Sequence, residues 1–123
     1  MYQRELTVDE SVEPGRELAR RRDCSAVFAT ADMLAAGVIA GLAEQGRRVP
    51  QDISVIGFDD VFFSRLTAHP LTTIHQDIMR KGAAAAGVMM DYLEGKEIAF
   101  RNIIMPVTLV ERGSVSDRRA PGV

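Results

Sequence analysis

Two short apolar runs separated by a helical pattern constrain the fold of this chain more than any other feature. The first run is residues 25–30 (SAVFAT); the second is residues 53–58 (ISVIGF) and is followed directly by Asp59 and Asp60. Short apolar runs bounded by turn-forming residues are typical of buried strands. Buried strands that alternate with helices predict an α/β fold, with a parallel sheet flanked by helices.

The N-terminal part predicts a short strand followed by a helix. Residues 2–8 (YQRELTV) are a polar strand candidate. Ser11 is the expected N-cap of a helix over residues 12–22, with Pro14 in the first turn, where proline is tolerated.

A second helix is predicted over residues 32–45, ended by Gly46, which can take a left-handed conformation. Its apolar positions recur every four residues, at Leu34, Val38 and Leu42. Such a stripe packs against the rest of the protein. The spacing of Gly37 and Gly41 predicts a close approach to a neighbouring helix or to the sheet.

The C-terminal half predicts a third helix and one more strand. Residues 61–74 lack a clean period and indicate a loop with a helical turn, then an extended crossover. A helix over residues 76–94 has an apolar face with small residues in its middle, which predicts a closely packed partner. That face comprises Met79, Ala83, Ala86, Met90 and Leu93. Pro106 makes residues 103–110 an edge-strand candidate, and residues 112–123 are expected to form a frayed polar tail.

Composition favours one domain of a cytoplasmic protein. The chain has 123 residues and a formal charge of −2, so it has no global attraction for nucleic acid or anionic lipid. The single cysteine, Cys24, cannot form an internal disulfide, which suits a reducing compartment. Residues 1–22 contain no apolar leader segment. Four arginines near the start indicate a solvated helix face or, less simply, a phosphate-binding patch: Arg16, Arg20, Arg21 and Arg22.

Asp59 and Asp60 are the strongest candidates for ligand contacts. Residues that follow a strand of a parallel sheet line the crevice where ligands bind. Carboxylates there can accept charge-assisted hydrogen bonds from sugar or nucleoside hydroxyls. The structural alternative is that one of them caps the next turn while the other points to solvent. A metal site is less favoured, because no histidine or third acid lies at ligand spacing.

Other residues near the same edge are weaker candidates for ligand contacts. Ala31 and Asp32 follow the first buried strand, although Asp32 also suits a simple helix cap. Gln76 follows the crossover, where it either reaches a ligand or begins the next helix. His69 and His75 have no acid or serine partner at a catalytic spacing, so they are expected to be surface histidines.

No motif for catalysis or for a cofactor is present. The sequence contains no nucleophile elbow, no glycine-rich phosphate loop and no zinc ligand set, so we expect no enzyme activity and no cofactor. A receiver-like phosphotransfer domain would place its acids near the first strand and a lysine after a later one, and this chain does neither.

Segments VPQDISVIGFDD (49–60) and PLTTIHQD (70–77) resemble those of the LacI/GalR family of bacterial transcription regulators. FATADMLAAGVIAGLAEQG (28–46), Gly95 and LVERGS (109–114) support the resemblance. It implies a partial periplasmic-binding-protein-like fold: residues 1–114 form the C-terminal portion of an effector-binding domain, and residues 115–123 form a flexible tail. The helix-turn-helix headpiece, hinge helix and most of the N-terminal lobe would lie outside the chain.

The resemblance also implies a gap in the sheet. In the family, a central strand with its helix precedes Met1, and the equivalents of strands 2–8 and 25–30 lie on either side of it. Without that strand, backbone groups stay unpaired and an apolar face stays uncovered. The chain alone is therefore expected to be marginal, oligomeric or aggregation-prone, unless its strands re-pair or swap with a partner.

Site residues carry over one at a time. The resemblance implies effector contacts for Asp59 and Gln76 and an apolar pocket wall at Ile78. Ala31, beside Asp32, stands where many members have asparagine, so its side chain would offer the effector no hydrogen bond. A homodimer is also implied, with an interface that includes Leu34, Val38, Phe62 and Phe63.

The partners expected from the resemblance are a small effector (a sugar, nucleobase or similar molecule) and operator DNA, the latter only through the absent headpiece. No membrane is expected. A solute-binding protein for sugar transport is the alternative on the same fold.

Overall fold

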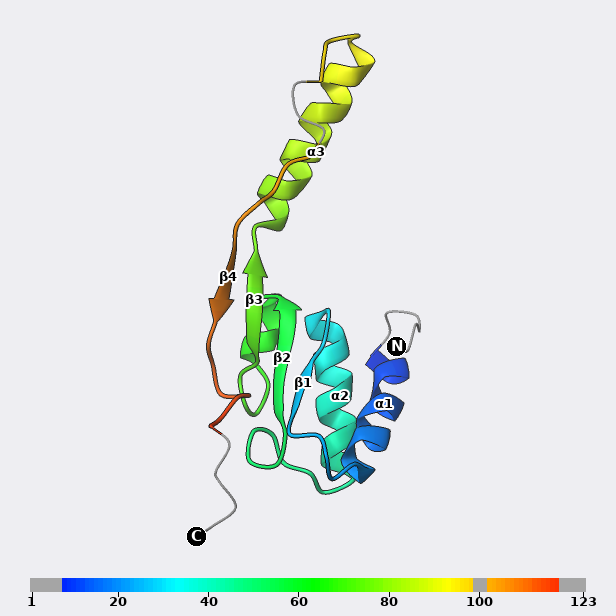
Figure 1. Ribbon diagram of the computed structural model, residues 1–123, viewed down its shortest axis with the longest axis vertical. Helices are drawn as coiled ribbons and strands as arrows, with labels where there is room; N and C mark the ends of the chain where they lie inside the picture. Colours follow the sequence, from blue (N-terminus) through cyan, green and yellow to red (C-terminus); the bar gives the residue numbers. More distant parts are fainter. Residues whose placement is uncertain (1–7, 99–101, 118–123) are drawn as a thin grey trace.

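The structure is a computed structural model, and it describes residues 8–98 and 102–117. Its elements in chain order are α1 (Val8–Arg20), β1 (Ala26–Phe28), α2 (Asp32–Glu44), β2 (Ser54–Asp59), the 3-10 helix η1 (Phe62–Arg65), β3 (Thr72–Gln76), α3 (Ile78–Leu93) and β4 (Val107–Val110). The strands form one four-stranded sheet in the order β1-β2-β3-β4 (Figure 1). The predicted α/β class, with a mostly parallel sheet and flanking helices, is confirmed.

The sheet is parallel except at its last strand. β1 pairs with β2 and β2 with β3 in parallel, whereas β4 runs antiparallel to β3, with Ile74 opposite Leu109. β4 begins directly after Pro106 and lies at the edge of the sheet. This edge position agrees with the prediction from the proline, which cannot donate a ladder hydrogen bond. The antiparallel direction was not predicted.

The predicted extended crossover is a regular strand of the sheet, β3. Thr72 and Thr73 are buried in a regular strand that pairs with β2 on one side and β4 on the other. The sequence pattern hid this strand because its buried side chains are threonines, whose hydroxyls are hydrogen-bonded inside the protein. Gln76 consequently ends a strand and does not begin a helix.

α2 covers one face of the sheet, and α1 packs against α2 (Figure 1). The core lies between α2 and the strands: Ala29, Ala35, Val38, Leu42, Val49, Ile53, Val55 and Leu71. A Cβ added to Gly41 would lie 2.1 Å from the carbonyl oxygen of Val12, and one added to Gly15 would lie 2.4 Å from that of Val38. The close helix approach predicted for Gly41 is therefore confirmed, because only glycine fits between the two backbones.

α1 begins earlier than predicted. It starts at Val8, so Ser11 is a buried residue inside the helix and not its N-cap, and Pro14 lies in the helix interior. The tertiary contact with α2 explains the difference, because packing of an amphipathic face stabilises a helix more than its local signals do. Apart from Val8, the strand predicted over residues 2–8 lies outside the described residues.

α3 extends away from the sheet (Figure 1). None of its residues is buried, and Met79 and Leu93 on its predicted apolar face are 83% and 71% exposed. The closely packed partner predicted for this face is therefore absent from residues 8–98 and 102–117. No helix in these ranges is long and apolar enough to cross a membrane.

The free edge of β1 is relevant to the predicted gap in the sheet. Among the described residues, β1 has only β2 as a neighbour, and Phe28 is 58% exposed. The expectation that the chain alone is marginal or aggregation-prone stays a prediction.

The segment after β4 corrects the expectation of a frayed tail from residue 112. Ser114 is fully buried: its hydroxyl donates to the carbonyl oxygen of Val55 at 2.6 Å and accepts from the amide of Thr72 at 2.8 Å. Further along, the amide of Ser116 donates to the Ser54 hydroxyl at 3.2 Å. Small polar residues here satisfy backbone groups of β2 and β3, and such contacts leave no signal in the sequence.

Candidate functional site

The carboxyl ends of β2 and β3 place two of the predicted site residues together. Asp59 ends β2 and Gln76 ends β3, and the two strands are parallel neighbours. The side-chain amide of Gln76 donates to Asp59 Oδ1, and Gln76 Oε1 accepts from Lys81 Nζ at 3.2 Å. Asp59 and Gln76 are each partly exposed. A carboxylate, an amide and an ammonium group thus form a hydrogen-bonded row at the edge where parallel sheets bind ligands.

The backbone changes direction sharply at the end of β2. Asp59 has a φ of 108° and Asp60 a φ of 53°. Positive φ is uncommon for residues other than glycine, and it persists only where surrounding contacts enforce it. Among the described residues other than glycine, only these two have positive φ, and they are adjacent in the chain.

The side chain of Asp60 is not available to contact a ligand. Its side chain is only 4% exposed, and it accepts from Arg112 Nη2, lies 3.1 Å from His75 Nδ1 and lies 3.5 Å from Arg65 Nη2. Burial by itself raises the pKa of the Asp60 carboxyl, but Arg112, with His75 and Arg65, outweighs burial and holds that pKa below its ordinary value. The alternative prediction, in which one aspartate caps the next turn and the other points to solvent, is therefore wrong for Asp60, which does neither.

Arg112 is a residue that the sequence patterns did not reveal. Its guanidinium also donates to the carbonyl oxygen of Leu71 at 2.9 Å and to the Ser64 hydroxyl at 3.4 Å. His75 is exposed, as expected of a surface histidine, but its Nδ1 lies 3.1 Å from Asp60 Oδ2, an acid partner that the sequence spacing did not indicate. Both contacts join distant parts of the chain, so the sequence offered no spacing that would indicate them.

Asp32 is a structural residue of the site's edge. It is fully buried, its Oδ1 accepts from the Thr73 hydroxyl at 2.6 Å, and its Oδ2 accepts from the amide of Val61 at 2.9 Å. It is not a helix cap: Ala31 holds the N-cap position of α2, without a side-chain bond. Gly57 makes the arrangement possible, because a Cβ there would lie 2.2 Å from Asp32 Oδ1. Full burial leaves Asp32 no surface for an effector.

Ile78 and Ala31 are the remaining residues predicted to lie at the site. Ile78 begins α3 and is 53% exposed, directly after Asp77, whose carboxylate caps the helix by accepting from the amide of Arg80 at 2.9 Å. Ala31 is partly buried beside Asp32 and offers no polar side-chain atom.

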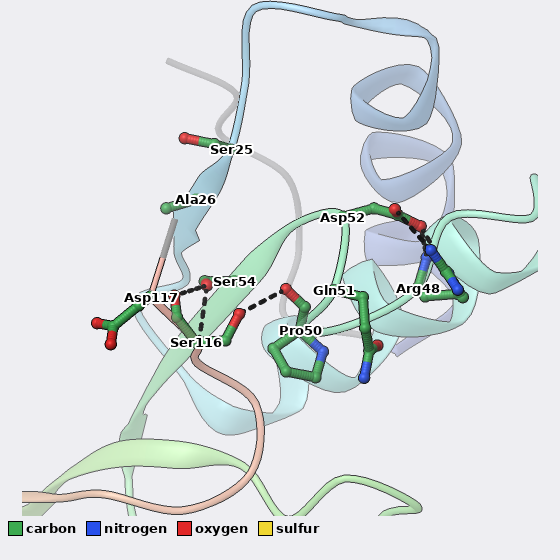
Figure 2. A pocket seen from close by; sticks show the side chains of 9 residues that line it. All are labelled: Ser25, Ala26, Arg48, Pro50, Gln51, Asp52, Ser54, Ser116 and Asp117. Carbon is green, nitrogen blue, oxygen red and sulfur yellow. Dashed lines mark hydrogen bonds and ion pairs between the residues drawn. The ribbon is translucent and has the colours of Figure 1, made fainter. Parts of the chain in front are cut away.

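Two hollows lie near opposite ends of the sheet. One, of about 520 Å³, has Gln76 and Lys81 at its polar part and apolar residues of α3 and of the segment before β4 along its wall. The other, of about 700 Å³, lies at the amino ends of β1 and β2, where Arg48 pairs with Asp52 (Figure 2). Of the predicted ligand-binding residues, Gln76 lines the first hollow and none lines the second. We therefore place the candidate site at the carboxyl edge.

The predicted interface residues differ in exposure. Val38 is 6% exposed and belongs to the core, and Leu34 packs against that core. Phe62 on η1 is 76% exposed, and Phe63 is partly buried. The core position of Val38 corrects its assignment to an interface, because little of its side chain remains for a partner.

The described residues contain no group of three histidine, cysteine or acidic side chains that could hold a metal ion. The hydrogen-bonding groups of the carboxyl edge suit a polar organic ligand.

Comparisons with known proteins assign the family. The model of the periplasmic binding protein-like domain matches residues 2–115. The HTH-type transcriptional repressor PurR of Erwinia tasmaniensis is 42% identical over 100 residues, which are 81% of this chain and 29% of the repressor.

Two solved structures are similar in fold and sequence. A LacI family transcriptional regulator from Enterococcus faecium, with bound ribose, is 30% identical with a TM-score of 0.79, covering 89% of this chain and 40% of the regulator. A LacI family regulator from Lactobacillus casei, with bound sucrose, is 33% identical with a TM-score of 0.71, covering 89% of this chain and 41% of the regulator.

The named relatives are transcriptional repressors or regulators, in agreement with the prediction that the chain is not an enzyme. The chain spans less than a third of the repressor's length. On the domain match and these identities, the chain belongs to the periplasmic-binding-protein-like family, in the form found in the effector-binding domain of LacI-type transcriptional regulators.

Proposed function

We propose that this chain contributes one side of an effector site in a LacI-type regulator, with Asp59 as the central polar contact. The observation that carries the proposal is the difference between the two aspartates. Asp60 is enclosed by cationic groups, whereas Asp59 is partly exposed at the carboxyl edge and bonds to the uncharged amide of Gln76. A carboxylate in that position can accept hydrogen bonds from ligand hydroxyls.

The proposed effector is a sugar, a nucleobase or a similar small polar molecule. Ribose and sucrose in the two related regulators support a ligand rich in hydroxyl groups. Gln76 supplies an amide that can both donate and accept, and Ile78 supplies an apolar wall. Ala31 supplies no polar contact, so we expect a ligand that is recognised mainly from the β2 and β3 ends.

A dimer is the second part of the proposal. Phe62 and Leu66, at and just after η1, are 76% and 67% exposed, and exposed aromatic side chains are typical of interface centres. Phe63 and the exposed part of Leu34 would extend such an interface. Contact with operator DNA would be made by another domain, and the regulator would act in the cytoplasm.

Isothermal titration of the chain with D-ribose, D-glucose and adenine tests the proposal. If Asp59 makes charged hydrogen bonds to the ligand, Asp59→Ala lowers the binding free energy by about 1.5–3 kcal/mol. That loss corresponds to about a 10- to 150-fold weaker Kd. Absence of binding by all three probes would contradict the proposal.

Asp23→Ala is the matched control for charge. Asp23 is an exposed carboxylate before β1, paired with Arg21 at 2.7 Å. Its removal changes the net charge by the same amount but should leave the Kd unchanged. If the Asp59→Ala variant binds the probe as tightly as Asp23→Ala does, Asp59 does not contact the effector.

A further inference from the structure

The kink at the end of β2 needs an external restraint. Asp59 and Asp60 both have positive φ, a conformation that costs a residue other than glycine of order 1–3 kcal/mol. The orientation of the Asp59 carboxylate depends on this kink, because Asp59 itself adopts the unusual backbone.

Contacts from three separate elements converge on the kink. Asp60 receives Arg112 from the segment after β4, His75 from β3 and Arg65 from η1. Asp32 holds the next residue by accepting from the amide of Val61 at 2.9 Å. The two residues that follow Asp59 are thus each held by contacts from other segments of the chain.

Arg112 ties this restraint to the rest of the fold. Its guanidinium bonds Asp60, the carbonyl oxygen of Leu71 and the Ser64 hydroxyl, while its own amide donates to the Thr72 hydroxyl at 2.9 Å. Its side chain is 14% exposed, so solvent competes little for these bonds. A planar guanidinium with several fixed acceptors holds its partner in one orientation.

We propose that Asp60 and Arg112 are positioning residues: their partly buried ion pair fixes the kink at the end of β2 and so holds the Asp59 carboxylate toward Gln76 and the effector. The effector part rests on the proposed function, whereas the orientation of Asp59 does not. A purely structural ion pair would stabilise the fold without controlling the Asp59–Gln76 bond.

The side-chain amide of Gln76 reports that bond without any ligand. In a two-dimensional ¹H–¹⁵N spectrum of the folded chain, we expect Asp60→Asn to move the assigned Gln76 Nε2 resonances toward those of a solvent-exposed glutamine. Asparagine suits this change because it tolerates positive φ and keeps the size of aspartate but removes the charge. Arg112→Lys, which keeps the charge and loses the planar fork, should move the same resonances in the same direction.

Ser114→Ala is the matched control. It removes the buried hydrogen bonds to Val55 and Thr72 from the same C-terminal segment but leaves Asp60 and Arg112 in place. We expect it to lower the urea midpoint while the Gln76 resonances stay unchanged. The proposal is overturned if Ser114→Ala moves them as far as Asp60→Asn does, or if neither Asp60→Asn nor Arg112→Lys moves them.

Titration with D-ribose, D-glucose and adenine then separates the two proposals. We expect Asp60→Asn to weaken the Kd of the probe that binds by about tenfold, the value of one misplaced charged hydrogen bond. If no probe binds the parent chain, the effector proposal fails, and the Gln76 resonances still decide the positioning role. An unchanged Kd in Asp60→Asn, with a parent chain that binds, overturns the link to the effector.

Discussion

Replacement of Asp32 by alanine tests whether a buried carboxylate joins α2 to the edge of the candidate site. Asp32 is fully buried and accepts from the Thr73 hydroxyl and from the amide of Val61. The variant leaves both donors without their acceptor in a space that Gly57 keeps small. Each of the two hydrogen bonds to a charged group contributes about 1.5–3 kcal/mol, so we expect a loss of about 3–6 kcal/mol in the free energy of unfolding.

That loss is large against the total stability of a chain of this size. For 123 residues, a stability of about 0.05–0.15 kcal/mol per residue gives roughly 6–18 kcal/mol. Urea unfolding followed by circular dichroism measures the difference, with m-values compared to verify that the same surface is exposed. A loss below about 1 kcal/mol would refute the idea that both bonds form in the folded protein.

Thr73→Val separates the two bonds. The valine side chain has a shape similar to that of threonine but lacks the hydroxyl donor, so Asp32 Oδ1 loses that partner. If the two residues interact directly, the double variant is less destabilised than the sum of the single variants, by about 0.5–3 kcal/mol. Asp23→Ala, at an exposed carboxylate, should stay within about 0.5 kcal/mol of the parent.

Two further predictions concern helix packing and acid stability. Gly41→Ala should cost about 1–3 kcal/mol in urea unfolding, because its Cβ would lie 2.1 Å from a carbonyl oxygen of α1. Gly82→Ala, with no atom within 4 Å, should instead be neutral or stabilising, and equal effects would contradict the packing argument. Hydrogen bonds with Arg48 lower the pKa of Asp52 from 3.8 to about 2, and the pKa of Asp60 is also lowered. The contribution of these two carboxylates to stability is therefore present above the pKa of an unfolded aspartate, and it is lost as pH falls from about 5 toward 2. A thermal midpoint that stays unchanged across that range would contradict both assignments.

Several elements could be predicted because their signals are local. The strand over residues 53–58, the helix over residues 32–45 and the edge strand after Pro106 each depend on a run, a period or a proline. α1 and β3 were misjudged for the opposite reason. Packing against α2 extends α1 past Ser11, and hydrogen bonds inside the sheet bury threonines that a hydropathy pattern counts as polar.

The candidate site shows the same division. Asp59 was predictable, since it follows a strand that the sequence shows clearly, and ligands bind at the carboxyl ends of parallel strands. The place of Gln76 at the end of a neighbouring strand was not predictable, because the sequence pattern did not reveal β3. The residue pattern did not distinguish Asp59 from Asp60, and only the family resemblance selected Asp59. The different surroundings of the two carboxylates depend on Arg112, which lies 52 residues after Asp60.

By itself, the sequence determined the α/β class and the order of most elements, and it predicted the edge at which we propose a ligand binds, because periodicity and strand ends act over a few residues. Only the tertiary structure showed which carboxylate is enclosed by cationic groups and which stays partly exposed. Burial and ion pairing depend on groups brought together from distant segments: Arg112 encloses Asp60, Thr73 and Val61 hold Asp32, and Asp59 stays partly exposed. The physical reason is that a carboxylate's role follows from the donors and solvent around it, and folding alone brings those donors together.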